Sequence, residues 1–267
     1  MTAPLDSGSS ARDAYEVFSS SYDDFNHGYM YERWTARLLS AAQDAGLRGD
    51  RLLDLACGTG LSFIPMLDRG WTVTACDISP AMLELARAKV GSAATLLTAD
   101  MRQLPRLGEF DLIWAVNDAM NYLLSSEDLE AALVGMRRNL APGGIVVFDV
   151  NTLTAYRRFF STVHSVEING RHFAWRGLMS AGEVESGSIN EAHFEAEGEE
   201  GSSHLHRQRH FSESEVLLAI EAAGLRSVQV MGESDGNLEP GLNEDLHTKA
   251  VYLCHKPGQA GKQDSSG

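Results

Sequence analysis

The sequence predicts an α/β protein with a doubly wound, seven-stranded and mostly parallel sheet that carries a small antiparallel β insertion. Two observations lead to this prediction. Between residues 51 and 150, short apolar runs with strand character alternate with amphipathic helical segments, a pattern typical of a parallel sheet with helical crossovers. Residues 163–211 break this rhythm with alternating residues and turn signals, which indicates three or four antiparallel strands.

Two helical segments, at 11–22 and 29–46, precede the first strand. The second of them places Leu38, Leu39 and Ala42 on one face. The strands of the main sheet are then expected at 51–56, 71–76, 94–98, 110–116, 144–150, 226–232 and 248–255. Their apolar runs are typical of strands that are buried on both faces.

The helices between these strands are expected near 60–69, 80–90, 126–140 and 212–223. Ser79 followed by Pro80 is an N-cap with a proline at the first helical position. Ser212 and Glu215 form a capping box for the last helix. The β insertion, at 155–211, lies just before that helix, so we expect it over the carboxyl ends of the strands, where ligands bind in such sheets.

Composition and charge narrow the classes of partner. Residues 1–10 and 257–267 are small and polar, which predicts disordered ends around one domain at 11–256. The chain has 22 basic and 37 acidic residues, a formal charge of −15, and this surface repels the phosphate backbone of a nucleic acid. We therefore expect no nucleic-acid partner. The β insertion has sheet edges that could pair in a homo-oligomer.

The lack of a membrane span, of a signal pattern and of paired cysteines indicates the cellular compartment in which we expect the protein. No apolar run is long enough to span a membrane, and the N-terminus has no signal pattern, so we expect neither membrane insertion nor export. The three cysteines, Cys57, Cys76 and Cys254, have no paired spacing. An odd, unpaired count favours a reducing cytoplasm over a disulfide framework.

A glycine turn follows the first strand. Residues 52–60 read Leu-Leu-Asp-Leu-Ala-Cys-Gly-Thr-Gly, and Gly58 and Gly60 allow a sharp turn that approaches a ligand closely. A strand, a glycine turn and a helix start together predict a nucleotide-type site. The dinucleotide fingerprint requires a further glycine where this chain has Phe63, which argues against NAD.

Two acids after the next strands suit an adenosine. Asp77 ends the second strand, where a carboxylate accepts hydrogen bonds from ribose hydroxyls, in S-adenosylmethionine as well as in NAD. Asp100 follows the third strand and can accept from the exocyclic adenine amine, with Met101 against the ring.

These residues resemble the class I S-adenosylmethionine-dependent methyltransferases, which have a Rossmann-like fold. The resemblance covers roughly residues 14–256 and is strongest over 51–151. It rests on the glycine turn, Asp77-Ile78-Ser79 with Met82, Ala99-Asp100-Met101, Phe110-Asp111-Leu112-Ile113, and Leu140 with Pro142-Gly143-Gly144. Two further stretches resemble a small-molecule subgroup that includes aminosugar N-methyltransferases. They are Asn117-Asp118 through Asn121-Tyr122-Leu123, and Phe148-Asp149-Val150-Asn151.

The resemblance implies S-adenosyl-L-methionine as cofactor and S-adenosyl-L-homocysteine as product. It also implies that residues 11–46 form a helical lid over the cofactor. The cofactor-binding residues it implies are Tyr15, Tyr22, Trp34, Asp54, Ala56, Cys57, Gly58, Thr59, Gly60, Asp77, Ile78, Met82, Asp100, Met101, Arg102 and Asn117. For the lid tyrosines, core packing is the competing interpretation.

The candidate catalytic residues are Asp118, Asn121 and His206. Asp118 and Asn121 follow the fourth strand and would face the acceptor, although caps and turn residues for the next helix are the alternative. His206 shares one face of a strand with His204, Gln208 and His210. It is the candidate base or orienting group. A polar strand face is the plainer explanation, and no ligand set completes a metal site, so we expect no metal.

Methyl transfer from a sulfonium needs no nucleophilic side chain, because the donor is already activated. The function expected is N-methylation of an amine-bearing small molecule in metabolite biosynthesis, including antibiotic biosynthesis. O-methylation of a related hydroxyl is one alternative, and it benefits from a base. A non-catalytic protein that binds the cofactor and acts through a partner is the other.

Overall fold

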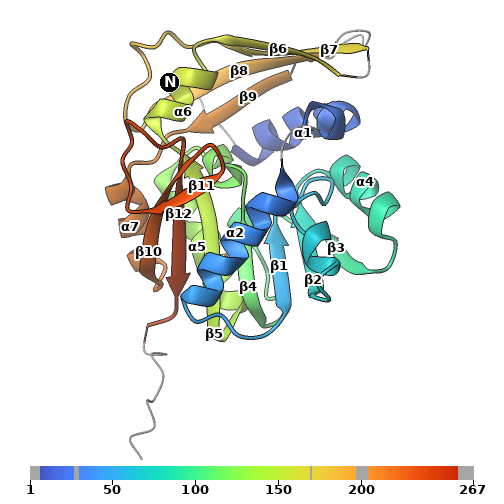
Figure 1. The fold of residues 1–267 in the computed structure, drawn as a ribbon, viewed down its shortest axis with the longest axis vertical. Helices are drawn as coiled ribbons and strands as arrows, with labels where there is room; N and C mark the ends of the chain where they lie inside the picture. The colour runs from blue at the N-terminus through green and yellow to red at the C-terminus, as the bar shows by residue number, and fades with distance from the viewer. Residues whose placement is uncertain (1–6, 27–29, 169, 197–203, 258–267) are drawn as a thin grey trace, which may run out of the picture.

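The computed structural model describes residues 7–26, 30–168, 170–196 and 204–257 (Figure 1). Its main sheet has the order β11-β10-β12-β5-β4-β1-β2-β3. These strands are β1 (Arg51–Leu55), β2 (Thr72–Asp77), β3 (Ala94–Thr98), β4 (Phe110–Ala115), β5 (Leu140–Asn151), β10 (Arg226–Ser234), β11 (Asn237–Pro240) and β12 (Lys249–His255). The mostly parallel, doubly wound sheet is confirmed, but it has eight strands where we expected seven.

The additional strand is β11, which pairs antiparallel with β10 at the sheet edge. Its four residues are polar apart from Leu238 and end in Pro240, so neither alternation nor an apolar run marks it in the sequence. Strand β12 runs antiparallel to both β5 and β10. The remaining contacts among β1 to β5 are parallel, as the strand–helix alternation predicted.

Helices cover both faces of the main sheet. The α-helices are α1 (Ser7–Phe25), α2 (Tyr31–Asp44), α3 (Ile64–Leu67), α4 (Pro80–Val90), α5 (Ser126–Asn139), α6 (Leu153–Phe159) and α7 (Glu213–Ala222). One core layer joins α2, α3 and α4 to Leu52, Leu112 and Val147 of the sheet. The other joins α5 and α7 to the alternate residues Leu53 and Ile113, so the period-two alternation of the strands separates the two layers.

Two expectations about helices need correction, and one helix was not expected. Helix α1 begins at Ser7, so residues 7–10 are helical and not disordered. The helix expected at 60–69 is reduced to α3, because the turn that contains Gly60, with φ +92°, occupies its first residues. Helix α6 was not expected, and Thr152 caps it through a hydrogen bond from the amide of Ala155. Residues 1–6 and 258–267 lie outside the described residues.

The β insertion forms a separate sheet of four antiparallel strands in the order β6-β7-β8-β9. They are β6 (Val163–Ile168), β7 (Arg171–Gly177), β8 (Ile189–Ala196) and β9 (His204–Arg209). Figure 1 shows α1 between this small sheet and the main sheet. Phe18 of α1 packs on Phe194 with ring centroids 4.1 Å apart, and Arg171 of β7 pairs with Asp24 of α1 at 3.0 Å.

Candidate active site

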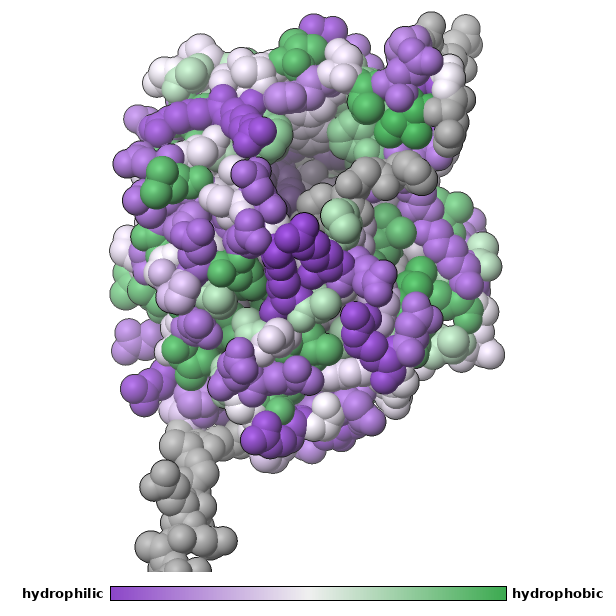
Figure 2. Space-filling view, viewed as in Figure 1, coloured by the Kyte–Doolittle hydropathy of each residue, from purple (hydrophilic) through white to green (hydrophobic). Residues whose placement is uncertain are grey.

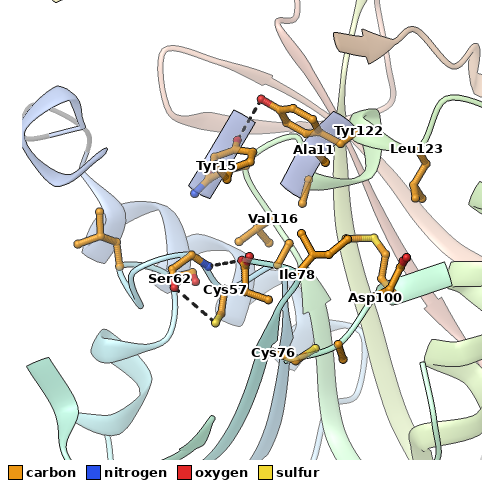
Figure 3. Close-up of a pocket in the computed structure, with 18 of the residues that line it drawn as sticks. Ala11, Tyr15, Cys57, Ser62, Cys76, Ile78, Asp100, Val116, Tyr122 and Leu123 are labelled. Carbon is orange, nitrogen blue, oxygen red and sulfur yellow. Dashed lines mark hydrogen bonds between the residues drawn. The ribbon is translucent and has the colours of Figure 1, made fainter. Parts of the chain in front are cut away.

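The first cavity lies at the carboxyl ends of β1, β2 and β4, under α1, with an empty volume of about 880 Å³. Figure 3 shows Tyr15 and Tyr122 on one side of it, and Cys57, Ile78 and Asp100 opposite them. Its lining includes these predicted residues: Tyr15, Tyr22, Ala56, Cys57, Gly58, Asp77, Ile78, Asp100, Met101, Arg102 and Asn117.

The glycine turn shapes the floor of this cavity. Ala56 and Gly58 both have left-handed backbones, with φ of +54° and +53°. A Cβ at Gly60 would lie 2.9 Å from the ring of Phe63, which is fully buried beneath the turn. Phe63 therefore fills the space under a turn in which Gly60 is required, and Gly60 itself does not line the cavity.

Asp77 lies at the end of β2 with only 6% of its surface exposed. Its carboxylate accepts the amide N–H of Gly58 at 2.8 Å and that of Ser79 at 2.9 Å, one on each oxygen. Each oxygen keeps a second lone pair, so the carboxylate can still accept two hydroxyl groups. Burial raises the pKa of Asp77, and backbone hydrogen bonds from Ser79, Gly58 and Ile78 oppose that rise.

Asp100 caps a 3-10 turn at Met101–Gln103 by accepting the amide N–H of Arg102. The side chain of Arg102 also pairs with the Asp100 carboxylate at 2.6 Å. The predicted acceptor for an adenine amine is thus held by a neighbouring guanidinium that lines the same cavity. Met101 and Ile78 supply apolar surface beside it.

A second cavity adjoins the first, with an empty volume of about 1270 Å³. It lies between α1, the small sheet, the carboxyl end of β5 and the amino end of β12, and Figure 2 shows the surface hollowed between the small sheet and the body below it. Its apolar walls include Phe18, Phe25, Phe159, Phe160 and Trp175. The two cavities share Tyr15, Tyr22, Tyr31, Asn117 and Tyr122, which we call the junction residues.

Hydrogen bonds join the junction tyrosines in pairs. The Tyr15 hydroxyl donates to that of Tyr122 at 3.0 Å, and the hydroxyls of Tyr22 and Tyr31 lie 3.1 Å apart. Burial raises the pKa of Tyr31 to about 12, so this phenol stays protonated. Tyr15 and Tyr22 line both cavities from α1, and their role in a lid stays a prediction. Tyr31 was not predicted as a site residue, because nothing in the sequence distinguishes it from an aromatic residue of the core.

Asp118 lines the second cavity, on the side expected for the acceptor. Its carboxylate accepts from Lys249 Nζ at 2.9 Å and from the side-chain amide of Gln208 at 2.6 Å. Lys249 also lines this cavity. The sequence analysis missed Lys249, and its only signal is a lone cation at the start of the apolar strand β12.

The structure corrects the role predicted for Asn121, which is fully buried and lines neither cavity. Its amide donates to the carbonyl of Arg209 at 2.9 Å, and its oxygen accepts the N–H of Asn151 at 2.9 Å. Both halves of the side chain are thereby engaged with backbone. Asn121 fixes the end of β9 to the end of β5 and does not face the acceptor.

His206 is also fully buried and lines neither cavity. Its Nδ1 lies 2.9 Å from the hydroxyl of Tyr122, and its Nε2 has no hydrogen-bond partner. Burial lowers the pKa of His206 to about 3. The predicted role as a base is therefore corrected: His206 hydrogen-bonds Tyr122 and packs edge-on against the ring of Tyr15 at a centroid distance of 5.5 Å, which leaves the orienting role.

Five further predicted residues lie away from the first cavity: Trp34, Asp54, Thr59, Gly60 and Met82. Trp34 belongs to the core layer beneath α2, and Met82 is fully buried on α4. Asp54 is buried under the turn and accepts a hydrogen bond from Ser62 at 2.5 Å. The Thr59 hydroxyl donates to Asp23 of α1 at 2.5 Å, so Thr59 attaches the lid.

Two other predicted polar side chains of this segment have separate partners. Gln208 of β9 binds Asp118 and Asn151, while His210, which follows β9, lies 3.2 Å from Glu244. Within the described residues, no three or more His, Cys, Asp or Glu side chains are grouped to hold a metal ion. None of the helices in the described part of the chain has the length and apolar character of a membrane span.

The residues of the first cavity fit an adenosyl group that carries an amino-acid tail. Asp77 has free lone pairs for two ribose hydroxyls, and Ile78 and Met101 offer apolar surface to a base. At the junction, Oδ1 of Asn117 is buried and has no hydrogen-bond partner. An unpaired buried acceptor is costly, and an ammonium or amine donor from a ligand would satisfy it.

Comparison with known proteins agrees with this fit. The family described as "Methyltransferase domain" matches residues 52–144. The dTDP-3-amino-3,4,6-trideoxy-alpha-D-glucopyranose N,N-dimethyltransferase of Streptomyces venezuelae is 30% identical over 231 residues, which cover 83% of this chain and 96% of that protein.

Two solved structures show the same fold. An S-adenosylmethionine-dependent methyltransferase from Clostridium acetobutylicum has a TM-score of 0.73 at 21% identity, covering 91% of this chain and 99% of that one. CalS10, an amino pentose methyltransferase from Micromonospora echinaspora solved with its cofactor bound, has a TM-score of 0.65 at 23% identity, covering 89% and 95%. With a relative of 30% identity matched over nearly its whole length, the chain belongs to the S-adenosylmethionine-dependent methyltransferases.

Proposed function

We propose that this enzyme transfers the methyl group to the amine nitrogen of a small molecule held in the second cavity. The observation that supports this most directly is the charge of the cavity floor. The carboxyl groups of Asp118, which lines the cavity, and of Asp149, buried beneath it, share the single ammonium group of Lys249. Carboxyl groups therefore outnumber the cations of this cluster beneath walls of aromatic rings, an environment that favours a cationic amine.

Bound S-adenosylmethionine supplies an activated methyl group. The chain's residues position the two partners and exclude water. The junction residues bring the two cavities together, and α1 covers both. An in-line displacement requires the acceptor atom to approach from the side opposite the leaving sulfur, and the second cavity opens onto the first at the junction.

The chemistry of the junction favours nitrogen over oxygen as the acceptor. A deprotonated amine has its own lone pair, whereas a hydroxyl benefits from a base that removes its proton. The predicted base, His206, is buried behind Tyr122, and its pKa is lowered to about 3. Among the residues that the structure describes, His164 is the histidine that lines a cavity, the second, and it hydrogen-bonds Thr162 and the carbonyl of Arg158 on its exposed side.

Two relatives suggest which acceptors to test first. One is named for the N,N-dimethylation of a nucleotide-linked 3-amino sugar, and the other for an amino pentose. The second cavity, with apolar walls and a floor of amide and carboxylate groups, would suit a sugar ring, which presents both C–H and hydroxyl surfaces. We therefore place the acceptor among amine-bearing metabolites of this kind.

The test uses methyl-labelled S-adenosylmethionine and matched pairs of acceptors that differ only in an amino or a hydroxyl group at the same carbon. We expect label in the amino member of a pair, and mass spectrometry of fragments to place it on nitrogen. Label in the hydroxyl member alone would establish O-methylation instead. Donor binding without transfer to any acceptor, including those of a metabolite extract, would indicate a non-catalytic binding protein.

A further inference from the structure

The loop after β4 has an unusual backbone. Asn117 and Asp118 are consecutive non-glycine residues in the left-handed region, with φ of +61° and +56°. L-residues rarely adopt this conformation, and it persists only where surrounding contacts enforce it. These residues lie where the two cavities meet: Asn117 lines both, and Asp118 lines the second.

One buried carboxylate enforces this conformation. Asp149, at the end of β5, has no exposed side-chain surface. It accepts the backbone N–H of Asn117 at 2.6 Å on one oxygen and the backbone N–H of Asp118 at 3.0 Å on the other. Two successive amides directed at one anion form an anion-binding concavity of the kind called a nest.

Lys249 supplies the matching positive charge. It opposes Asn151 in the β5–β12 register, and Asp149 lies two residues earlier on the same face of β5. Its ammonium group lies 2.8 Å from Asp149 and 2.9 Å from Asp118. The side chain of Lys249 is 13% exposed, so most of its surface is withdrawn from water. An ion pair this buried leaves a costly charge behind when one partner is removed.

We propose that Asp149 and Lys249 act as a positioning pair for methyl transfer, by holding Asn117 and Asp118 in the left-handed conformation at the junction. The pair connects the central strand β5 and the antiparallel strand β12 to the loop that faces both cavities. It directs the unpartnered Oδ1 of Asn117 to the junction and the Asp118 carboxylate to the acceptor side. This role rests on the methyl-transfer site proposed above, and it does not depend on whether the acceptor is an amine or a hydroxyl.

The ion pair between Asp149 and Lys249 should affect how kcat depends on pH. The largest charge effects on Asp149 come from Lys249, which lowers its pKa, and from Asp118, which raises it, while burial raises it most. Removing the ammonium therefore raises the pKa of Asp149 further. A protonated Asp149 has only one strong acceptor left for two amides, so the loop loses one of its two restraints.

The test compares Lys249→Met, Lys249→Arg and Asp149→Asn with wild type. We expect Lys249→Met to move the acid limb of kcat to higher pH by about one to three units, and Lys249→Arg to restore the limb. Asp149→Asn should lower kcat by about 100-fold, as expected for a displaced reacting geometry. Leu253→Ala, a buried substitution elsewhere on β12, should lower stability without moving the pH limb.

A second readout needs neither donor nor acceptor. In ¹⁵N-edited NMR spectra of the free protein, the Asn117 and Asp118 amides of Lys249→Met should shift together with pH through the titration of Asp149. In wild type the same shift should occur at lower pH. Amides that do not respond to this substitution would overturn the positioning role, even if no amine is ever methylated. A change in acceptor KM alone, with kcat and its acid limb unchanged, would also overturn it and make Lys249 an acceptor contact.

Discussion

The hydroxyl of Tyr122 lies 2.9 Å from Nδ1 of His206, on the side of Tyr122 away from the cavities. The same hydroxyl accepts a hydrogen bond from Tyr15. A chain of three side chains thus runs from the lid into the small sheet. It fixes the orientation of a junction tyrosine, and the buried histidine stays neutral at its far end.

This arrangement predicts a mild effect of His206→Gln, since glutamine can still accept from Tyr122. We expect kcat to fall by less than about tenfold, because loss of a general base costs about 10²- to 10⁴-fold. The pH profile of kcat should keep its shape. A loss of 100-fold or more, with the melting temperature unchanged, would restore His206 as a base.

Asp77 should govern affinity for the donor. Replacing it with Ala removes acceptors for the ribose hydroxyls and for the amides of Gly58 and Ser79. Hydrogen bonds to a charged group contribute about 1.5–3 kcal/mol, so we expect calorimetry with S-adenosylhomocysteine to show at least tenfold weaker binding. Asp68→Ala, which removes the same charge from an exposed position, is the control and should bind normally.

Asp54 should make stability depend on pH. Burial raises its pKa to about 7, and the hydrogen bond from Ser62 opposes that rise. Because the unfolded carboxyl has a pKa of about 4, the folded state binds more protons between about pH 4 and 7. The contribution of Asp54 to the free energy of unfolding therefore decreases as pH rises through this window.

The measurement is thermal unfolding of wild type and Asp54→Asn from pH 5 to pH 8. The amide carries no charge in either state, so the stability of Asp54→Asn relative to wild type should increase with pH. Asp68→Asn, at an exposed position, should show no such trend. A difference between wild type and Asp54→Asn that stays constant across this range would contradict the raised pKa.

The lid should be held by contacts of Asp23. Its carboxylate accepts from the Thr59 hydroxyl and pairs with Lys89, each at 2.5 Å. Asp23→Ala should speed the release of S-adenosylhomocysteine by about two- to tenfold, the effect of a hydrogen bond worth about 0.5–1.5 kcal/mol. Asp13→Ala changes the same charge at an exposed site on α1 and should leave the release rate unaltered. Equal rates for both variants in stopped-flow experiments would mean that Asp23 does not hold the lid.

Local signals predicted the donor side of the site well. The glycine turn and Asp77 depend on backbone geometry within one strand–turn–helix unit, and Asp77 lines the cavity as expected. The same signals placed Thr59 in the cavity, although its hydroxyl points to Asp23. That contact joins segments 36 residues apart, and no pattern within the glycine turn encodes it.

The acceptor side was harder to predict, because it depends on how two sheets pack. Alternation along β9 showed correctly that His206 and Gln208 share a face. It did not show that aromatic side chains of α1 would cover His206 and exclude it from the cavity, as Phe18 does at a centroid distance of 5.5 Å. Lys249 was missed for a similar reason, since its partners Asp118 and Asp149 lie 131 and 100 residues away.

The side-chain amide of Asn121 links the two sheets directly, because it hydrogen-bonds the backbone of Arg209 in the small sheet and the backbone of Asn151 in the main sheet. Because it contacts backbone only, the side chains of the small sheet are free to vary without loosening that link. This makes the segment from β6 to β9 an exchangeable module for protein engineering. Chimeras that import this segment from another methyltransferase should keep Asn121, together with His206 and Gln208, whose side chains contact Tyr122 and Asp118.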